Sequence, residues 1–262
     1  MSHSNNSRLL GEERRRKILQ MVEKDGQVTI TDLARRFRVS SVTVRADLDG
    51  LSENGTLLRS HGGAVKRNEA QDYPLRLKAS LHRSEKIRIA QAAGQLVRAN
   101  DTIILDSGTT TAEIATWLKE RQVRPLTVIT NALNISLELV DAPGISVIVL
   151  GGLLRPLSHS LVGPQAEAML GDLHADKFFL GVDGFDLEAG PSTPDVLEAQ
   201  LNSRMVLVAK ETVVVADSSK LGRRSVSRIA PTERINGLIT DRRAPADFVD
   251  ALRKRGTQVT LV

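Results

Sequence analysis

The chain contains no cysteine, few aromatic residues and no long hydrophobic run. With no Cys among 262 residues, a disulfide framework and a thiolate metal site are excluded. No apolar stretch approaches the roughly 20 residues that a membrane-spanning helix needs, and no N-terminal segment resembles a signal peptide. These absences predict a soluble cytoplasmic protein without a membrane partner.

Charge is distributed unevenly along the chain. Residues 1–67 contain 13 Lys or Arg against 8 Asp or Glu, whereas residues 68–262 contain 23 of each kind. The whole formal net charge of +5 therefore lies in the first quarter. Because neutralisation of phosphates supplies most of the non-specific affinity for DNA, this quarter is expected to bind a polyanion.

Two short amphipathic segments in the basic quarter have the spacing of a helix-turn-helix. Ile30, Leu33, Ala34 and Phe37 recur every three or four positions and define one face of a first helix, with Thr31 placed to cap its start. A tight connection at 38–39 follows. Upstream, residues 12–24 predict a supporting helix, whose basic run at 14–17 could contact phosphate or form a solvated face.

The second helix of the motif is expected to begin at Ser40 or Ser41, either of which is a good N-cap. Its buried stripe contains Val44, Leu48 and Leu51. The outward face is expected to carry Ser41, Thr43, Arg45 and Asp47. Small hydroxyls and an Arg near a helix N-terminus suit contact with base edges and phosphates in a major groove.

A Gly-rich hairpin comes next. Residues 56–59 and 64–66 predict two short strands joined through His61, Gly62 and Gly63, where glycine permits the positive backbone angles of a tight turn. The residues predicted to contact DNA are Thr31, Ser40, Ser41, Thr43, Arg45, Arg59, His61, Gly62 and Lys66. Two amphipathic helices also occur in helical hairpins that never meet DNA, but the basic charge favours the DNA-binding interpretation.

Two motifs, SSVTVRADL at 40–48 and LLRSHGGAV at 57–65, resemble the N-terminal signature of the DeoR family of bacterial transcriptional regulators. The family usually shows two basic residues before the Asp of the first motif, whereas Ala46 occupies one of these positions here. The resemblance implies an N-terminal winged helix-turn-helix domain that binds operator double-stranded DNA.

Beyond residue 67 the hydrophobic pattern changes. Residues 68–82 are polar and aperiodic and predict a linker, and the remaining 83–262 alternate apolar runs with helical patterns. Strands are expected at 102–105, 126–129, 145–150, 178–182, 213–216, 238–239 and 259–262, and helices at 85–97, 110–119, 133–140, 165–170, 196–208 and 246–254. This alternation predicts an α/β domain with a mostly parallel sheet covered by helices on both faces.

Polar and glycine residues follow several of these strands. Because ligands of such sheets bind beyond the carboxyl ends of the strands, the clustering predicts a pocket for a small polyhydroxyl phosphate. A helix start with hydroxyls and free N–H groups favours phosphate, although Thr109 or Thr110 could simply cap that helix. The residues predicted to bind the effector are Asp106, Ser107, Gly108, Thr109, Thr110, Thr130, Asn131, Gly152, Asp183 and Lys220.

Lys220 has two equally weighted interpretations. It could hold an effector phosphate, or it could pair internally with Asp217 or Asp183. The blocks LDSGTTT, TNAL, GG, GVDG and ADSSK together resemble the DeoR-family effector domain, which is related to phosphosugar isomerases. That resemblance implies a phosphorylated sugar as inducer, with its phosphate at 107–110 and a sugar hydroxyl at Asp183. The segment 181–200 is similar to regulators of amino-sugar catabolism, particularly N-acetylgalactosamine operons.

Relatedness to isomerases makes an isomerase-like enzyme the main alternative function. Such chemistry needs a carboxylate base, which Asp106, Asp183 or Glu198 could supply. The segment 181–193 contains no His, whereas deaminase-type enzymes carry a catalytic one there. We therefore expect binding without turnover, no catalytic residue, no metal and no cofactor apart from the effector. A homodimer or homotetramer is expected, since one winged domain contacts few base pairs.

Overall fold

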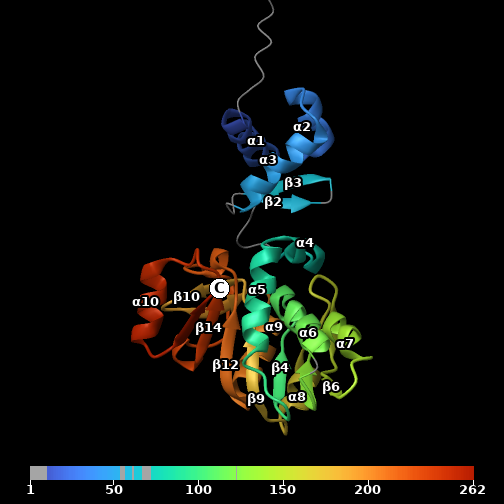
Figure 1. The fold of residues 1–262 in the computed structure, drawn as a ribbon, viewed down its shortest axis with the longest axis vertical. Helices are drawn as coiled ribbons and strands as arrows, with labels where there is room; N and C mark the ends of the chain where they lie inside the picture. Colours follow the sequence, from blue (N-terminus) through green and yellow to red (C-terminus); the bar gives the residue numbers. More distant parts are fainter. Residues whose placement is uncertain (1–10, 54–56, 61, 67–71, 122) are drawn as a thin grey trace, which may run out of the picture. The chain divides into compact units, whose positions relative to one another are not determined.

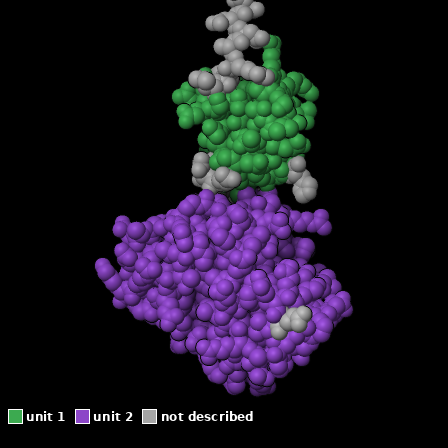
Figure 2. All heavy atoms as spheres, in the orientation of Figure 1, with its two compact units in different colours: residues 1–69 green, residues 70–262 purple. Residues whose placement is uncertain are grey.

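The computed structural model describes residues 11–53, 57–60, 62–66, 72–121 and 123–262. The chain divides into two compact units, an N-terminal unit of residues 1–69 and a C-terminal unit of residues 70–262. Figure 2 colours these units green and purple. Within the described residues, no helix is both long and apolar enough to cross a membrane.

The N-terminal unit contains three helices and a small antiparallel sheet (Figure 1). Its elements are α1 (Gly11–Asp25), β1 (Gln27–Thr29), α2 (Ile30–Phe37), α3 (Ser41–Glu53), β2 (Leu57–Ser60) and β3 (Gly63–Lys66). The strand order β1-β3-β2 puts the hairpin beside a third strand that the sequence pattern did not predict. The helical predictions are confirmed, and the apolar stripes of all three helices meet in one core.

The start of α2 differs from its prediction. Thr29, and not Thr31, is the N-cap, because its Oγ1 accepts a hydrogen bond of 3.1 Å from the N–H of Asp32. Thr31 lies inside the helix and is exposed. At the other end, Arg38 adopts the left-handed conformation with a φ of 53°, which turns the chain sharply toward α3.

The C-terminal unit is built on a seven-stranded parallel sheet. Its strands, in the order β15-β14-β12-β9-β4-β5-β6, are β15 (Gln258–Leu261), β14 (Gly237–Thr240), β12 (Ala209–Val215), β9 (Ala175–Leu180), β4 (Thr102–Leu105), β5 (Leu126–Thr130) and β6 (Ile145–Val149). All seven were predicted, and the parallel α/β interpretation is confirmed.

Helices cover both faces of this sheet. One core contains side chains from α5 (Arg83–Gly94), α6 (Thr109–Arg121) and α7 (Leu133–Leu139). The other contains side chains from α8 (Pro164–Leu170), α9 (Val196–Val208) and α10 (Ala246–Lys254). Successive strand residues supply opposite cores, as Ile103 and Ile104 do, because side chains alternate across a strand.

Smaller elements surround the sheet. They are the hairpin of β7 (Leu153–Arg155) and β8 (Ser160–Val162), the three strands β10 (Gly184–Asp186), β11 (Gly190–Thr193) and β13 (Ser227–Arg228), and two 3-10 turns, η1 (Ser218–Lys220) and η2 (Thr232–Arg234). One of them, η2, directly precedes β14 and so lies toward the amino end of that strand. The predicted linker is not wholly irregular, because residues within it form α4 (Leu75–Ser80).

Candidate functional site

A serine cap sets the first turn of α3. Ser40 Oγ accepts a hydrogen bond of 3.1 Å from the backbone N–H of Thr43 and lies 2.9 Å from the Thr43 hydroxyl. The cap satisfies an N–H group that a helix start otherwise leaves without a partner. Ser40 is therefore the N-cap, and the alternative N-cap, Ser41, is the first residue of the helix.

The face of α3 that begins at this cap is open to solvent. Ser41 and Arg45 are exposed and Thr43 is half-buried. Among the described residues, Arg45 makes no side-chain hydrogen bond or ion pair. A guanidinium without an internal partner can form the bidentate contact with guanine that is common in major-groove recognition.

Asp47 does not belong to that open face, so its predicted orientation is wrong. Its carboxylate accepts a hydrogen bond from Arg14 of α1, and the two side chains are only 7% and 10% exposed. One member of the basic run at 14–17 is therefore buried. This ion pair fixes the outward-facing helix against its support, because removing either partner of a buried pair is costly.

Arg59 of the hairpin after α3 makes two hydrogen bonds that stabilise it. Arg59 donates to Asp49 Oδ1 and to the carbonyl of Gly63, each at 2.8 Å, so its guanidinium joins α3 to the turn. Gly62 is exposed. Lys66 ends β3, and His61 lies outside the described residues.

Gly63 is required for a reason that the sequence pattern did not identify. A Cβ on it would lie 1.8 Å from the carbonyl oxygen of Val28, because β3 pairs with β1 at this point. Its backbone does not have a positive φ. The close approach of two strands, and not the geometry of the turn, therefore calls for glycine here.

Asp106 organises the loop after β4 in the C-terminal unit. Its Oδ1 accepts from the N–H of Gly108 at 3.0 Å and its Oδ2 from the N–H of Gly181 at 2.9 Å. The Thr111 hydroxyl lies 2.9 Å from Oδ1. Burial raises the pKa of Asp106 to about 7, against the lowering effect of these donors. Asp106 is also one of the predicted effector ligands, and in the structure its carboxylate joins two loops.

The start of α6 offers hydroxyls of different accessibility. Ser107 and Thr109 are half-buried, whereas Thr110 is buried with 6% exposure. Among the described residues, neither Ser107 nor Thr109 makes a side-chain hydrogen bond. These two hydroxyls and the N–H groups of the first turn therefore suit an anion better than Thr110 does.

Residues after β5 and β6 have mainly internal roles. Thr130 is fully buried and accepts a hydrogen bond from the N–H of Ala132. Gly152 has a φ of +127°, and a Cβ there would lie 2.5 Å from the carbonyl oxygen of Val162, so it is needed where β7 meets β8. Asn131 donates to the carbonyl of Leu161, but its buried Oδ1 has no hydrogen-bond partner among the residues that the structure describes.

Asp183 is the centre of a charged cluster beyond β9. Lys78 Nζ lies 3.1 Å and Lys220 Nζ 3.3 Å from its carboxylate, and the Thr193 hydroxyl lies 3.4 Å from Oδ2. Although burial alone would raise the pKa of Asp183, Lys220 and Lys78 lower it to about 2. Of the two interpretations of Lys220, the structure shows the internal pair, with Asp183 as the partner.

Arg155 of β7 forms a second hub, which the sequence pattern missed. It pairs with Asp72, with Asp195 at 2.9 Å and with Glu198 at 3.1 Å. Glu198 also accepts a hydrogen bond of 2.9 Å from Ser160. The partners of Arg155 range from residue 72 to residue 198, so no local spacing could have indicated this cluster.

Residues 78 to 86 bring further basic groups to the same end of the sheet. Lys86 is buried, donates to the carbonyl of Leu81 at 2.7 Å and also contacts the carbonyl of Lys78. Burial lowers the pKa of Lys86 to about 8. His82 Nε2 lies 3.9 Å from Asp217 Oδ1, and burial lowers the pKa of this imidazole.

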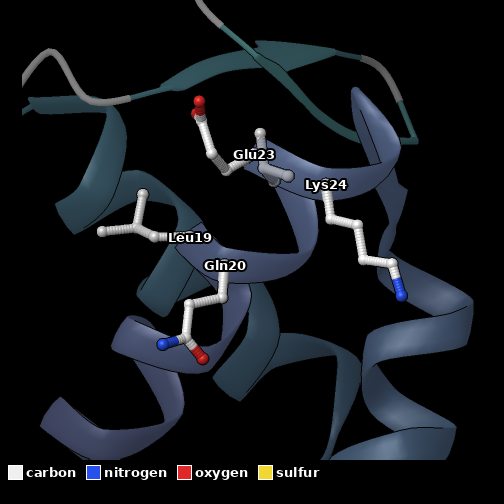
Figure 3. A pocket seen from close by; sticks show the side chains of 5 residues that line it. Leu19, Gln20, Glu23 and Lys24 are labelled. Atoms are coloured by element: carbon white, nitrogen blue, oxygen red, sulfur yellow. The ribbon is translucent and has the colours of Figure 1, made fainter.

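Two pockets lie away from these clusters. One, of about 550 Å³, is lined by α1 residues that include Leu19, Gln20, Glu23 and Lys24 (Figure 3). The other, of about 440 Å³, lies along α8, α9 and β13. The described residues that line these pockets include none of the predicted DNA-binding or effector-binding residues.

Family models match both units. A DeoR-like helix-turn-helix domain matches residues 14–70, and a DeoR C terminal sensor domain matches residues 81–242. Among curated relatives, a protein of Escherichia coli O157:H7 named as an aga operon transcriptional repressor is 40% identical over 253 residues, which cover 95% of this chain and 93% of the relative. The transcriptional repressor AccR of Agrobacterium fabrum is 34% identical over 232 residues, which cover 88% and 89%.

Solved structures show weaker similarity. Ribose 5-phosphate isomerase A of Methanocaldococcus jannaschii has a TM-score of 0.37 and 19% identity, covering 52% of this chain and 53% of that chain. A translation initiation factor eIF-2B of Pyrococcus horikoshii OT3 has a TM-score of 0.45 and 16% identity, covering 88% and 82%.

The assignment rests on the agreement of the family models with relatives that align over nearly the whole length. The helix-turn-helix match covers the α2–α3 motif, and the sensor-domain match covers most of the parallel sheet. The chain belongs to the DeoR family of transcriptional regulators.

Proposed function

We propose that the protein represses a sugar or amino-sugar catabolic operon and leaves its operator when a phosphorylated sugar binds the C-terminal unit. The names of relatives support repression, since two that align over most of this chain are named as repressors. The relative named for the aga operon supports the amino-sugar part of the proposal.

The observation that carries the ligand proposal is the convergence of polar groups at the carboxyl end of the sheet. The accessible hydroxyls of Ser107 and Thr109 stand at the start of α6, where an anion is favoured. Asp183, with its pKa lowered to about 2, is a charged acceptor for a sugar hydroxyl. A phosphate and a hydroxyl-bearing carbon chain match these two sets of groups.

In this proposal the phosphosugar acts as an effector and is not turned over. Asp106 uses its carboxylate oxygens within the loops that it joins, which does not suit a base that must reach substrate. His174 is exposed just before the first residue of β9, and therefore lies at the amino end of the sheet. Incubation of the purified protein with candidate phosphosugars, followed by chromatography of the products, should give no isomer; isomer formation would support the enzyme alternative.

Repression would require paired recognition helices. A dimer or tetramer of this chain would place two α3 helices in successive major grooves, since a single winged domain recognises too few base pairs for useful specificity.

The central test is binding of the full chain to its own promoter region at fixed salt, with and without a panel of hexose and amino-sugar phosphates. Release by one panel member is expected, and tight binding unaffected by any of them would refute the ligand proposal.

The DNA part of the proposal has its own test in Arg45. Arg45→Ala should weaken operator binding by about 1–3 kcal/mol, as expected for loss of a bidentate base contact, and should leave phosphosugar binding unchanged. Arg88→Ala is the matched control, because it removes the same charge from an exposed position of α5 in the C-terminal unit. Equal operator affinity of the Arg45 variant and the native protein would count against α3 as the recognition helix.

A further inference from the structure

The segment 72–82, named here the strap, links the chain leaving the N-terminal unit to the sheet of the C-terminal unit. It comprises Asp72, α4 and His82 and leads directly into α5. Figure 1 shows α4 beside α5 and α6. One buried apolar side chain, Leu75, anchors the strap, and its backbone N–H donates to the carbonyl of Leu157 at 2.7 Å.

The remaining anchors of the strap are mostly charged groups that belong to the candidate site. Lys78 contacts Asp72 at 2.8 Å and Asp183 at 3.1 Å. Asp72 also pairs with Arg155, and Lys86 holds two carbonyls at the end of α4. A short helix held in this way depends on those contacts, because isolated helices of this length are unstable in water.

The carboxylate of Asp183 faces two lysines and a hydroxyl that it shares with Glu198, because Thr193 Oγ1 lies 3.4 Å from both Asp183 Oδ2 and Glu198 Oε2. Oδ1 faces Lys220 and Lys78, and Oδ2 faces Lys78 and Thr193. A carboxylate offers about four acceptor positions. Lys78 and Lys220 face most of these positions, so a sugar hydroxyl that donates to Asp183 competes with a lysine.

Lys78 is the donor whose departure requires the least rearrangement. Lys220 lies on η1, which Asp217 caps through the N–H of Ser219 and which Asp241 holds through Ser218. Thr193 belongs to β11, which is paired on both sides. Lys78 instead lies on the six-residue α4, outside any sheet.

We propose that Lys78 competes with the effector for Asp183, so that phosphosugar binding releases the strap and thereby changes the segment that leads to the DNA-binding unit. This inference rests on the proposed function, in which a sugar hydroxyl binds Asp183. It gives the strap the role of the two-state element that coupling between distant sites requires.

The test is hydrogen exchange of peptides covering 72–82 in the full chain. The native protein is measured alone, with inorganic phosphate, and with glucosamine 6-phosphate, galactosamine 6-phosphate or galactose 6-phosphate, while calorimetry reports which of these binds. The variant is Lys78→Met, and the matched control is Arg76→Met, which removes the same charge from an exposed position of α4. Thermal unfolding confirms that each variant is folded.

When a phosphosugar binds the native protein, amide hydrogen exchange of the strap should accelerate on the order of tenfold, because the strap then detaches from the sheet more easily. Lys78→Met should show the same acceleration without ligand, and Arg76→Met should not. Lys78→Met should also bind the phosphosugar at least as tightly as the native protein, yet its DNA affinity should no longer respond.

Three results would refute competition. The first is unchanged amide hydrogen exchange of the strap when a phosphosugar binds the native protein. The second is unchanged exchange of the strap in Lys78→Met without ligand. The third is tenfold weaker phosphosugar binding by Lys78→Met, which would make Lys78 a ligand of the effector. Failure of every panel member to bind the native protein would instead refute the proposed function, and it would do so in the calorimetric measurement. The native-protein measurements need no variant, so they remain decisive if Lys78→Met fails to fold.

Discussion

Asp106 and Asp183 are both buried at the same end of the sheet, yet the pKa of each moves in a different direction. Burial raises the pKa of Asp106 to about 7, because its partners are neutral donors. Burial has the same effect on Asp183, but Lys220 and Lys78 reverse it and lower the pKa to about 2. A neighbouring cation therefore decides which carboxylate stays charged near neutral pH.

The raised pKa of Asp106 makes stability depend on pH. Between the unfolded value of 3.8 and the folded value of about 7, the folded protein keeps a proton that the unfolded chain has lost. The free energy of unfolding should therefore fall as pH rises through this window, by up to about 1.4 kcal/mol per pH unit, and this contribution should be constant above it.

Urea unfolding of the native protein and of Asp106→Asn at pH 5 and pH 8 measures this effect. The asparagine cannot titrate, so the advantage of the native protein over the variant should be larger at pH 5 than at pH 8. An advantage that grows with pH would mean that the three donors outweigh burial and that the pKa of Asp106 is low. Thr111 is compatible with a charged or a protonated Asp106, because its hydroxyl can donate to the carbonyl of Gly108 when it does not donate to Asp106.

Two aspartates of α3 should differ in their effects on stability. Asp47 is buried against Arg14, whereas the side chain of Asp49 is 56% exposed and pairs with Arg59. Asp47→Ala should destabilise the N-terminal unit by about 3–5 kcal/mol, as breaking a buried pair does. Asp49→Ala should cost at most about 1 kcal/mol. Chemical denaturation followed by circular dichroism compares them, and equal losses would contradict a structural role for the Arg14–Asp47 pair.

At the scale of elements, α5 and α6 pack closely at one glycine. A Cβ on Gly94 would lie 2.2 Å from the ring of Trp117, so Gly94→Ala should separate the helices. Overpacking costs about 1–3 kcal/mol, and the better helix propensity of Ala returns up to about 1 kcal/mol, so a net loss of stability is expected.

Gly50→Ala provides the contrasting control for this prediction. Gly50 also lies within a helix, but its nearest neighbour is the mobile end of the Arg15 side chain at 3.4 Å. This substitution should raise stability by up to about 1 kcal/mol. When Trp117 is replaced by Leu, the Gly94→Ala substitution should destabilise the protein much less. A full cost in that variant would show that the Trp117 ring is not its cause.

Most of the elements could be predicted from the sequence because their signals are local. The inner strands of the large sheet are largely buried and form apolar runs such as TIIL at Thr102–Leu105. The edge strands β6 and β15 are more exposed but are still apolar enough to be recognised. The stripes of α2 and α3 have helical spacing. Strands of three residues, such as β1 and β7, are too short to show a period, and α4 lies in a polar stretch that resembles a linker.

The candidate site was less predictable, because tertiary contacts decide which polar residues face outward. The patterns found Asp183 and Lys220, which lie in the loops that follow β9 and β12. They missed Lys78, which reaches Asp183 from α4, and Arg155 of β7, which is the centre of the second cluster. They also assigned Asp47 to the open face of its helix, since local spacing cannot show that Arg14 lies opposite.

At the scale of the whole molecule, the two units differ in charge as well as in fold. The entire net charge of +5 belongs to the first 67 residues, which suits contact with a phosphate backbone. Residues 68–262 contain equal numbers of basic and acidic residues, and some of these form internal pairs around Asp183 and Arg155. An effector that binds these internal pairs can influence DNA binding only if it favours one arrangement of the chain over another.

Coupling between the two units must be reciprocal. If a phosphosugar lowers operator affinity, then operator DNA must lower phosphosugar affinity by the same factor, and a coupling of about 1–3 kcal/mol corresponds to roughly 5–150-fold. Calorimetric titration of the free protein and of the operator-saturated protein with the same phosphosugar should give this ratio, matching the loss of operator affinity in a separate DNA titration. Thr109→Asp is the control, since a carboxylate at the start of α6 should repel the phosphate and abolish both effects while preserving operator affinity. Equal phosphosugar affinity with and without operator would show that ligand binding and DNA binding are independent in this protein, whatever the ligand.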